Sequence, residues 1–182
     1  MNLSAIPDHH TQYLLAHPGE AYGYLRGRQP SIGWLGRLGG KQARVPEDWP
    51  REPAREMAID ENLGTDAVSM HYLLNGVLDP VDAASDLFQG WITGQPRQAR
   101  RLGGLRTFAF LHDRSQVDGF DDCLRALDDA ALFTRSRDNL ARCGSEADEL
   151  DLQGVRSQLQ VLRDVYSDAR RQNRCVLFAP WR

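Results

Sequence analysis

Several features that direct a protein to a membrane or out of the cell are missing from this sequence. No apolar run approaches the roughly 20 residues that a membrane-spanning helix needs. The first residues, MNLSAIPDHHTQYLLAHPGE, lack a basic start followed by an uninterrupted apolar core, so they predict no secretory signal peptide. We therefore expect a cytoplasmic protein with no membrane partner.

Cysteine and lysine are also scarce. The three cysteines, Cys123, Cys143 and Cys175, are widely spaced and include no C-x-x-C pair, which argues against a disulfide framework or a cysteine-built zinc site. Only Lys41 among the 22 basic residues is a lysine, and the formal net charge is −3. Because neutralising phosphates requires a positive surface, we expect reduced cysteines and no nucleic-acid partner.

The motifs of common catalytic centres are absent as well. The glycine-rich stretch GWLGRLGGK (33–41) lacks the serine or threonine that a phosphate-binding loop carries after its lysine, and no G-x-S-x-G occurs. None of the five histidines belongs to an H-x-x-x-H or H-E-x-x-H pair. His9 and His10 are neighbours, and we expect them to point to different sides of a helix. The sequence thus predicts no catalytic residues, no metal site and no cofactor.

The composition is that of one globular domain. The chain has 182 residues, of which 41% are hydrophobic and 26% charged, a balance that suits a packed core and not a disordered chain. Prolines and glycines concentrate in the segment from about 27 to 64, where we expect an irregular loop. We predict a single domain over residues 1–182.

The strongest periodic signal lies near the C-terminus. Apolar residues step by 3, 4, 3, 4 and 3 at Leu152, Val155, Leu159, Leu162, Tyr166 and Ala169. This spacing predicts a helix of about twenty residues that ends near Gln172 and Asn173 and packs against the core. The compact run CVLFA (175–179) predicts a strand directly after it.

Weaker patterns predict the remaining elements. We expect strands at 3–6 and 105–111 and a turn-rich basic stretch at 91–104. Shorter helices are predicted at about 8–16, 20–25, 65–76, 81–88, 116–127, 128–134 and 137–143. Together the patterns predict an α+β fold, rich in helices and with a small sheet.

Two groups of residues are candidates for a functional site. His71 lies on the apolar side of its predicted helix beside Tyr72, and a pocket there could also include His112 and Asp113; the alternative is a buried, hydrogen-bonded core histidine. The candidates for binding a partner are aromatic residues in loops and acidic residues at 145–151, namely Trp34, Trp91, Glu146, Asp148, Glu149 and Asp151. For these the alternatives are tryptophans that cover core edges and a solvated helix start.

Three segments resemble the YfbM-like family, small bacterial proteins grouped as a domain of unknown function. They are MHYLLNG (70–76), DPVDAASDLFQG (79–90) and LQVLRDVYSDARRQNRCVLFA (159–179). The chain departs from the family pattern at Ala67, where the family often has tryptophan, and at Asn173, where it has glycine. The resemblance implies an α+β fold with a small sheet wrapped by helices, and it implies no established reaction, cofactor or catalytic residue.

These observations favour a non-enzymatic protein that binds another protein. The concrete hypothesis is an immunity protein that neutralises an interbacterial, secretion-system toxin by occluding it, since small acidic domains of this kind, including some relatives, fit toxin–immunity settings. Carboxylates would steer a basic partner, and aromatic side chains would anchor it. The alternatives are a small-molecule-binding protein or enzyme with a pocket near His71, and a self-associating structural protein, so we expect a monomer or a homodimer.

Overall fold

In the part of the chain that the structure describes, five strands form an antiparallel sheet with the order β2-β1-β5-β4-β3. The computed structural model describes residues 1–30, 45–57, 72–76, 99–104, 107–142 and 149–179, and the first four residues of the last range by their backbone alone. The strands are β1 (Asn2–Ile6), β2 (Arg55–Glu56), β3 (Arg100–Gly103), β4 (Phe108–His112) and β5 (Cys175–Ala179).

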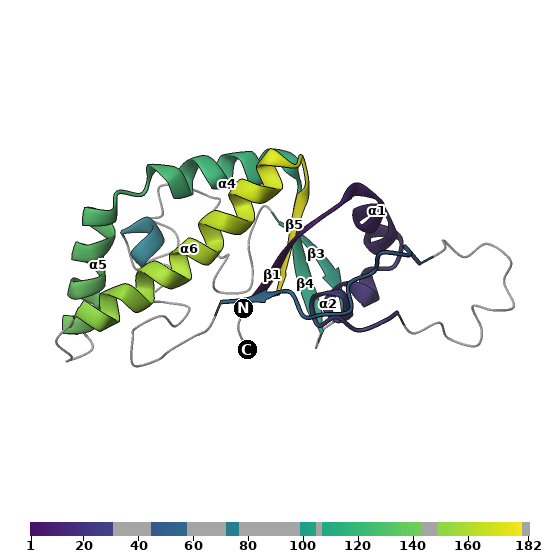
Figure 1. Cartoon of the computed structure of the whole chain (residues 1–182), viewed down its shortest axis with the longest axis horizontal. Helices are drawn as coiled ribbons and strands as arrows, with labels where there is room; N and C mark the ends of the chain where they lie inside the picture. Colours follow the sequence, from purple (N-terminus) through teal and green to yellow (C-terminus); the bar gives the residue numbers. More distant parts are fainter. Residues whose placement is uncertain (31–44, 58–71, 77–98, 105–106, 143–148, 180–182) are drawn as a thin grey trace, which may run out of the picture.

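Helices lie on both faces of this sheet. Figure 1 shows α4 and α6 running beside each other on one side, with α5 beyond them, while α1 and α2 lie on the other side. The helices are α1 (Asp8–Ala16), the 3-10 turn η1 (Pro18–Glu20), α2 (Ala21–Leu25), α4 (Arg114–Ala126), α5 (Asp129–Arg142) and α6 (Glu149–Arg171). The arrangement confirms the predicted α+β fold with a small sheet.

The central strand β5 is buried on both faces. Val176 and Phe178 pack against the core on the α4–α6 side, and Cys175, Leu177 and Ala179 pack against the core on the α1–α2 side. A strand covered on both faces needs apolar residues at every position. This explains why the predicted strand CVLFA appears in the sequence as an unbroken apolar run.

The larger core lies between the sheet and the helices α4 and α6. The periodic residues of α6 from Val155 to Ala169 are all buried there, at 5% exposure or less. They meet Val117, Phe120 and Leu124 of α4, and the rings of Phe120 and Tyr166 stack with their centroids 4.4 Å apart. Packing on the domain's own core, as predicted, therefore accounts for the stripe on α6.

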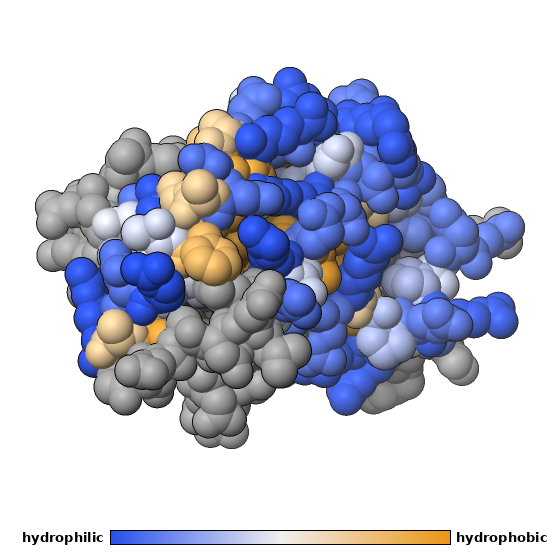
Figure 2. All heavy atoms as spheres, turned by 60° about the vertical axis from the view of Figure 1, so that its left-hand side comes forward, coloured by the Kyte–Doolittle hydropathy of each residue, from blue (hydrophilic) through white to orange (hydrophobic). Residues whose placement is uncertain are grey.

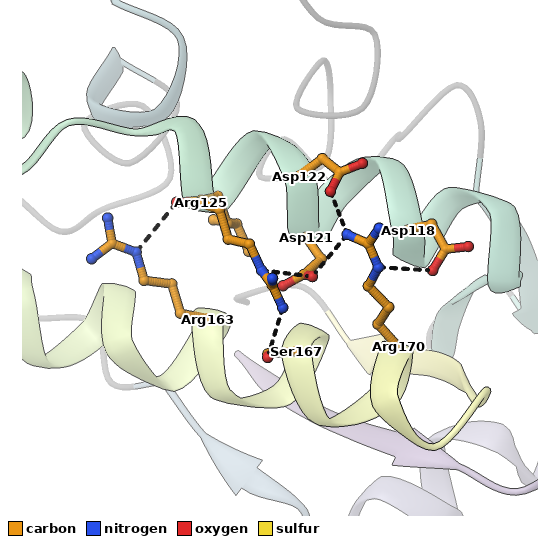
Figure 3. Close-up of polar contacts among 8 residues, drawn as sticks. Asp118, Asp121, Asp122, Arg125, Arg163, Ser167 and Arg170 are labelled. Carbon is orange, nitrogen blue, oxygen red and sulfur yellow. Dashed lines mark hydrogen bonds and ion pairs between the residues drawn. The ribbon is translucent and has the colours of Figure 1, made fainter.

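Ion pairs reinforce the contact between α4 and α6 (Figure 3). The carboxylate of Asp121 is only 1% exposed and lies 2.9 Å from the Arg125 guanidinium and 3.2 Å from that of Arg170. Arg170, on α6, also pairs with Asp118 and Asp122 on α4. Because a buried carboxylate is costly unless it is paired, these arginines compensate for the burial of Asp121.

Another arginine of α6 holds the end of α4. Arg163 donates hydrogen bonds to the carbonyl oxygens of Leu124 and Leu127, at 3.3 and 3.0 Å, and pairs with Asp129 at the start of α5. The last carbonyls of a helix have no partner within the helix, so a cation from outside satisfies them well. This one side chain thereby links α4, α5 and α6.

The end of α6 is closed by a left-handed residue. Asn173 has a φ of 54°, its N–H donates to the Arg170 carbonyl, and the N–H of Arg174 donates to the Ala169 carbonyl. This pair of bonds is the Schellman arrangement, which glycine usually provides and which asparagine tolerates. The prediction that the helix ends at Gln172–Asn173 is confirmed.

One predicted break between helices is wrong. Residues 128–134 and 137–143 were expected to form two helices, but Asp129–Arg142 is one continuous helix, α5. No glycine or proline interrupts this stretch, and Leu132, Ser136, Asn139 and Leu140 are buried at helical spacing along it. Two of these buried residues are polar, so an apolar stripe was hard to recognise in the sequence.

The predicted turn-rich stretch 91–104 was also wrong in its last residues. Residues 100–103 form the edge strand β3, which pairs with β4 from Arg100 opposite Leu111 to Gly103 opposite Phe108. Only Leu102 is buried in this strand, so the alternating pattern is short. Gly103 has a φ of 101°, and a Cβ there would lie 2.5 Å from the Thr107 carbonyl oxygen, so the hairpin requires glycine.

Other predictions agree with the structure where it describes the chain. The strands at 3–6 and 105–111 correspond to β1 and β4, of which β4 continues to His112. Residues 72–75 are helical and stop at Gly76, which has a φ of 76°. The predicted helix at 81–88 lies outside the described residues. Among the helices that the structure describes, none is long and apolar enough to cross a membrane.

Replacing Asn173 tests the closure of α6. We expect Asn173→Gly to raise the free energy of unfolding by about 0.5 kcal/mol, because glycine adopts positive φ without a Cβ clash. Asn173→Ala should lower it by about 1 kcal/mol for the opposite reason. Urea denaturation of the two variants and the parent protein measures both changes. Equal stability of the glycine and alanine variants would contradict this assignment.

The Asp121 carboxylate gives a second stability test. Asp121→Asn keeps the shape but leaves Arg125 and Arg170 without their buried anion, so we expect a loss of about 2 kcal/mol in the free energy of unfolding. Asp122→Asn is the matched control, since Asp122 pairs with the same Arg170 but is exposed; its loss should stay below about 0.5 kcal/mol. Chemical denaturation distinguishes the two, and similar losses would refute the importance of burial.

Candidate functional site

Tyr72 is the first of the predicted pocket residues that the structure describes, and its contacts join it to α5. Its side chain is 7% exposed, and the Arg142 guanidinium lies over its ring at 4.7 Å from the centroid. The same short helical turn is held by Arg135, which donates to the Leu73 carbonyl at 2.9 Å. Tyr72 therefore helps attach residues 72–76 to α5.

His112 lies inside the larger core. Its ring is 1% exposed and packs near the rings of Phe120 and Phe178. Its Nδ1 is 2.9 Å from the Tyr166 hydroxyl. Burial away from water disfavours the charged ring and lowers the pKa of His112 to about 4. His112 is thus neutral at physiological pH and bonded within the core.

Asp113, the next residue, faces outward and begins α4. Its carboxylate accepts a hydrogen bond from the Gln116 backbone N–H at 3.0 Å, and the Gln116 side-chain oxygen accepts one from the Asp113 N–H at 2.8 Å. These reciprocal bonds are a capping box. Asp113 also borders an open hollow of about 440 Å³ between α1 and α4, beside Arg114 and Cys175. The chain thus places the neighbours His112 and Asp113 in different environments.

Most of the other candidates lie outside the described residues. These are His71, Trp34, Trp91, Glu146 and Asp148. Glu149 and Asp151 belong to the first turn of α6, where only the backbone is described. The pocket near His71 and the partner-binding role of the tryptophans and acidic residues remain predictions.

The structure forms a cluster that the sequence pattern did not reveal. His9 and His10, from the first turn of α1, both contact the carboxylate of Asp48: His9 Nε2 lies 2.9 Å and His10 Nε2 3.0 Å from its Oδ1. The two histidines were expected to point to different sides of the helix. In the structure both Nε2 atoms instead contact the same oxygen of Asp48, which lies between them. The adjacent histidine pair was the only local signal, and its partner comes from a loop far along the chain.

The three residues of this His–His–Asp cluster differ in burial. The side chain of His10 is 3% exposed, whereas those of His9 and Asp48 are 55% and 63% exposed. Burial lowers the pKa of His10, and the hydrogen bond from His9 is the main reason that the pKa of Asp48 falls to about 2. At neutral pH the cluster therefore combines a carboxylate with at least one neutral imidazole.

Aromatic side chains hold the buried His10 on the side of its ring that faces away from Asp48. The Tyr24 hydroxyl lies 2.7 Å from His10 Nδ1, on the opposite side of the ring from Asp48. The rings of Tyr24 and Trp49 pack around His10, and the Trp49 indole N–H donates to the Arg28 carbonyl at 2.9 Å. Both ring nitrogens of His10 thus have defined partners, so the ring has one preferred orientation.

The cluster offers three side-chain donor atoms at one point. A donor atom from each of His9, His10 and Asp48 lies within 4.8 Å of the other two. Imidazole nitrogen and carboxylate oxygen are ligands of first-row transition ions and can also exchange protons. Among the described residues, this is the group whose side chains could hold a metal ion.

A groove runs along the outer edge of β1. It has a volume of about 170 Å³ and lies between β1, at Leu3 to Ala5, and one side of α6. The residues that line it are Leu3, Ser4, Ala5, Arg55, Val165, Asp168, Gln172 and Arg174. Leu3 and Val165 give the groove apolar lining, and Arg55, Asp168 and Arg174 give it charged lining.

Comparisons with protein-family models, with curated proteins and with solved structures give no match for this chain. The resemblance to the YfbM-like family rests on the three sequence segments alone, and it stays a prediction.

The buried His112 predicts a pH dependence of stability. Its pKa is about 4 in the folded protein and near 6.5 in an unfolded chain, so the unfolded state binds the proton first as the pH falls. The free energy of unfolding should therefore drop by roughly 3 kcal/mol between pH 6.5 and 4 through this one residue. His112→Gln, which keeps a polar partner for Tyr166, should show a shallower decline in denaturation measured over this range. Parallel curves would exclude His112 as the source.

Proposed function

We propose that this protein acts by binding another protein, most concretely as an immunity protein that neutralises an interbacterial toxin by occluding it. The observation that supports the proposal best is the groove beside β1, which borders both the edge of a strand and a helix. The resemblance to a family without an established reaction and the predicted acidic stretch at 145–151 agree with a binding role.

Among the described residues, no strand pairs with one edge of β1 beyond Leu3. Within the described part of the chain, β2 pairs with β1 only at Asn2 and Leu3, whereas β5 pairs with all of β1 from the other side. Beyond Leu3 the groove follows the backbone of Ser4 and Ala5. An extended segment of a partner can pair with such an edge, and its alternate side chains then enter the neighbouring groove.

The charges at the groove define the partner segment further. Asp168 pairs with Arg171 within α6, and Arg55 of β2 pairs with Asp164 of α6; all four side chains are exposed. Arg174, which directly precedes β5 in the chain, also lines the groove. A segment with an apolar side chain over Val165 and an acidic one beside Arg174 would match these features.

Figure 2 shows the side of the molecule where α5 and α6 lie, and its described side chains are mainly hydrophilic, with apolar ones in small separate groups. Broad apolar patches mark many protein interfaces, but strand addition obtains its affinity mainly from backbone hydrogen bonds. The groove therefore fits a partner without requiring such a patch.

A bulky residue in the groove tests the proposal. Gln172→Trp places an indole in the groove, and if a toxin is encoded next to this gene, we expect the variant to bind that toxin at least about tenfold more weakly. Gln153→Trp is the matched control, because Gln153 is an exposed glutamine of α6 that does not line the groove. Affinity is measured by biolayer interferometry and inhibition by the residual toxicity in a co-expression assay.

The two parts of the proposal can fail separately. If the protein forms no complex with the neighbouring toxin, the immunity role is refuted. If a complex forms and both tryptophan variants bind as the parent does, the groove is not the interface. Circular dichroism of each variant confirms that the fold is retained, so that a loss of binding is attributable to the surface.

A further inference from the structure

We propose that His9, His10 and Asp48 bind a divalent first-row transition ion, of which Zn²⁺ and Ni²⁺ are the natural probes. The donor atoms lie within 4.8 Å of one another and come from two segments, the start of α1 and the loop before β2. This inference goes beyond the proposed function and concerns different residues from the groove beside β1.

The geometry requires little movement to accept an ion. Metal–ligand bonds of about 2.0 to 2.1 Å in a tetrahedron separate the donor atoms by about 3.3 Å. The Asp48 Oδ1 atom lies 2.9 Å from His9 Nε2 and 3.0 Å from His10 Nε2. These two separations need to widen by only about 0.3 to 0.4 Å to fit the tetrahedral edge. His9 and Asp48 are both more than half exposed, so fewer packing contacts oppose such a movement of their side chains than of His10.

The buried histidine is oriented as a metal ligand usually is. A ligating imidazole generally donates its second N–H to an oxygen, which fixes the ring and its tautomer. In His10 the Nε2 atom faces Asp48 and the Nδ1 atom faces the Tyr24 hydroxyl at 2.7 Å. The Nδ1-protonated tautomer of His10 would donate to Tyr24 and leave Nε2 free for the ion. Tyr24 is thus a positioning residue, held by the ring packing with Trp49.

The donor types select the class of ion. Two imidazole nitrogens and one carboxylate oxygen suit Zn²⁺, Ni²⁺ and Cu²⁺, whereas Mg²⁺ and Ca²⁺ prefer sites made of oxygen. Three protein donors leave at least one coordination position for water or for another ligand. Because the side chains of His9 and Asp48 are more than half exposed, that position would face solvent.

The position of the site predicts what the ion would do to the fold. Asp48 precedes Trp49, which is buried in the second core among Tyr13, Tyr24 and Leu25. Apart from turns, residues 45–54 have no regular secondary structure. An ion shared between Asp48 and α1 would fasten this segment over the core, so binding should stabilise the folded state.

Titration of the tag-free protein with Zn²⁺ alone tests the inference. We expect one ion per chain by isothermal titration calorimetry, a raised Tm, and no comparable effect of Mg²⁺. His9→Ala and Asp48→Asn should each weaken Zn²⁺ binding by more than about tenfold, and Tyr24→Phe should weaken it by about tenfold, because each removes a donor or its orienting partner. Cobalt substitution should give the absorption of a tetrahedral Co²⁺ site.

The matched controls are other histidine and acidic residues nearby. His17→Ala removes a histidine at the end of α1 that bonds to the Tyr13 carbonyl, and Glu47→Gln removes the acidic neighbour of Asp48. Both should bind Zn²⁺ as the parent does. Absence of saturable binding in the parent would overturn the inference, as would unchanged affinity of the His9 and Asp48 variants. In that case the cluster is a hydrogen-bonded contact between α1 and the loop.

Discussion

Burial of β5 on both faces is the constraint on which the rest of this structure depends. A strand with five apolar residues in succession cannot leave either face in water, so helices must cover both sides of the sheet. Val176 and Phe178 meet the α4–α6 layer, and Leu177 meets the α1–α2 layer. The two cores therefore lie on opposite faces of the same sheet, and a change at the central strand β5 affects both.

The two cores differ in the polar groups that they contain. On the α4–α6 side, His112 is neutral and bonded to Tyr166, and the charge of Asp121 is compensated by arginines. The buried polar groups of these two residues therefore bond to other residues of the protein. On the α1–α2 side, His10 is backed by aromatic rings but shares a carboxylate with an exposed histidine. In the second arrangement the side chains of His9 and Asp48 are more than half exposed, so an ion from solvent can reach their donor atoms, and the chemistry that we propose lies there.

Adjacent residues at the end of a strand have different roles in the structure, and the sequence did not distinguish them. His112 and Asp113 are adjacent, yet one ends a buried strand and the other caps an exposed helix. The alternation of a strand and the start of a helix send neighbouring side chains to different environments. Conversely, His9 and His10 converge on Asp48 across a long stretch of chain. Neither outcome follows from spacing alone.

By itself, the sequence determined the elements whose pattern is local: the apolar stripe of α6, its end at Asn173, the unbroken strand β5 and the α+β class. These follow from backbone geometry and hydrophobic periodicity, which act within a few residues. Tertiary structure decided the edge strand β3, the continuity of α5, the pairing of Asp121 with arginines of two helices, and the cluster at Asp48. These features depend on which segments, far apart in the sequence, lie against one another in the folded protein. No local pattern specifies those contacts.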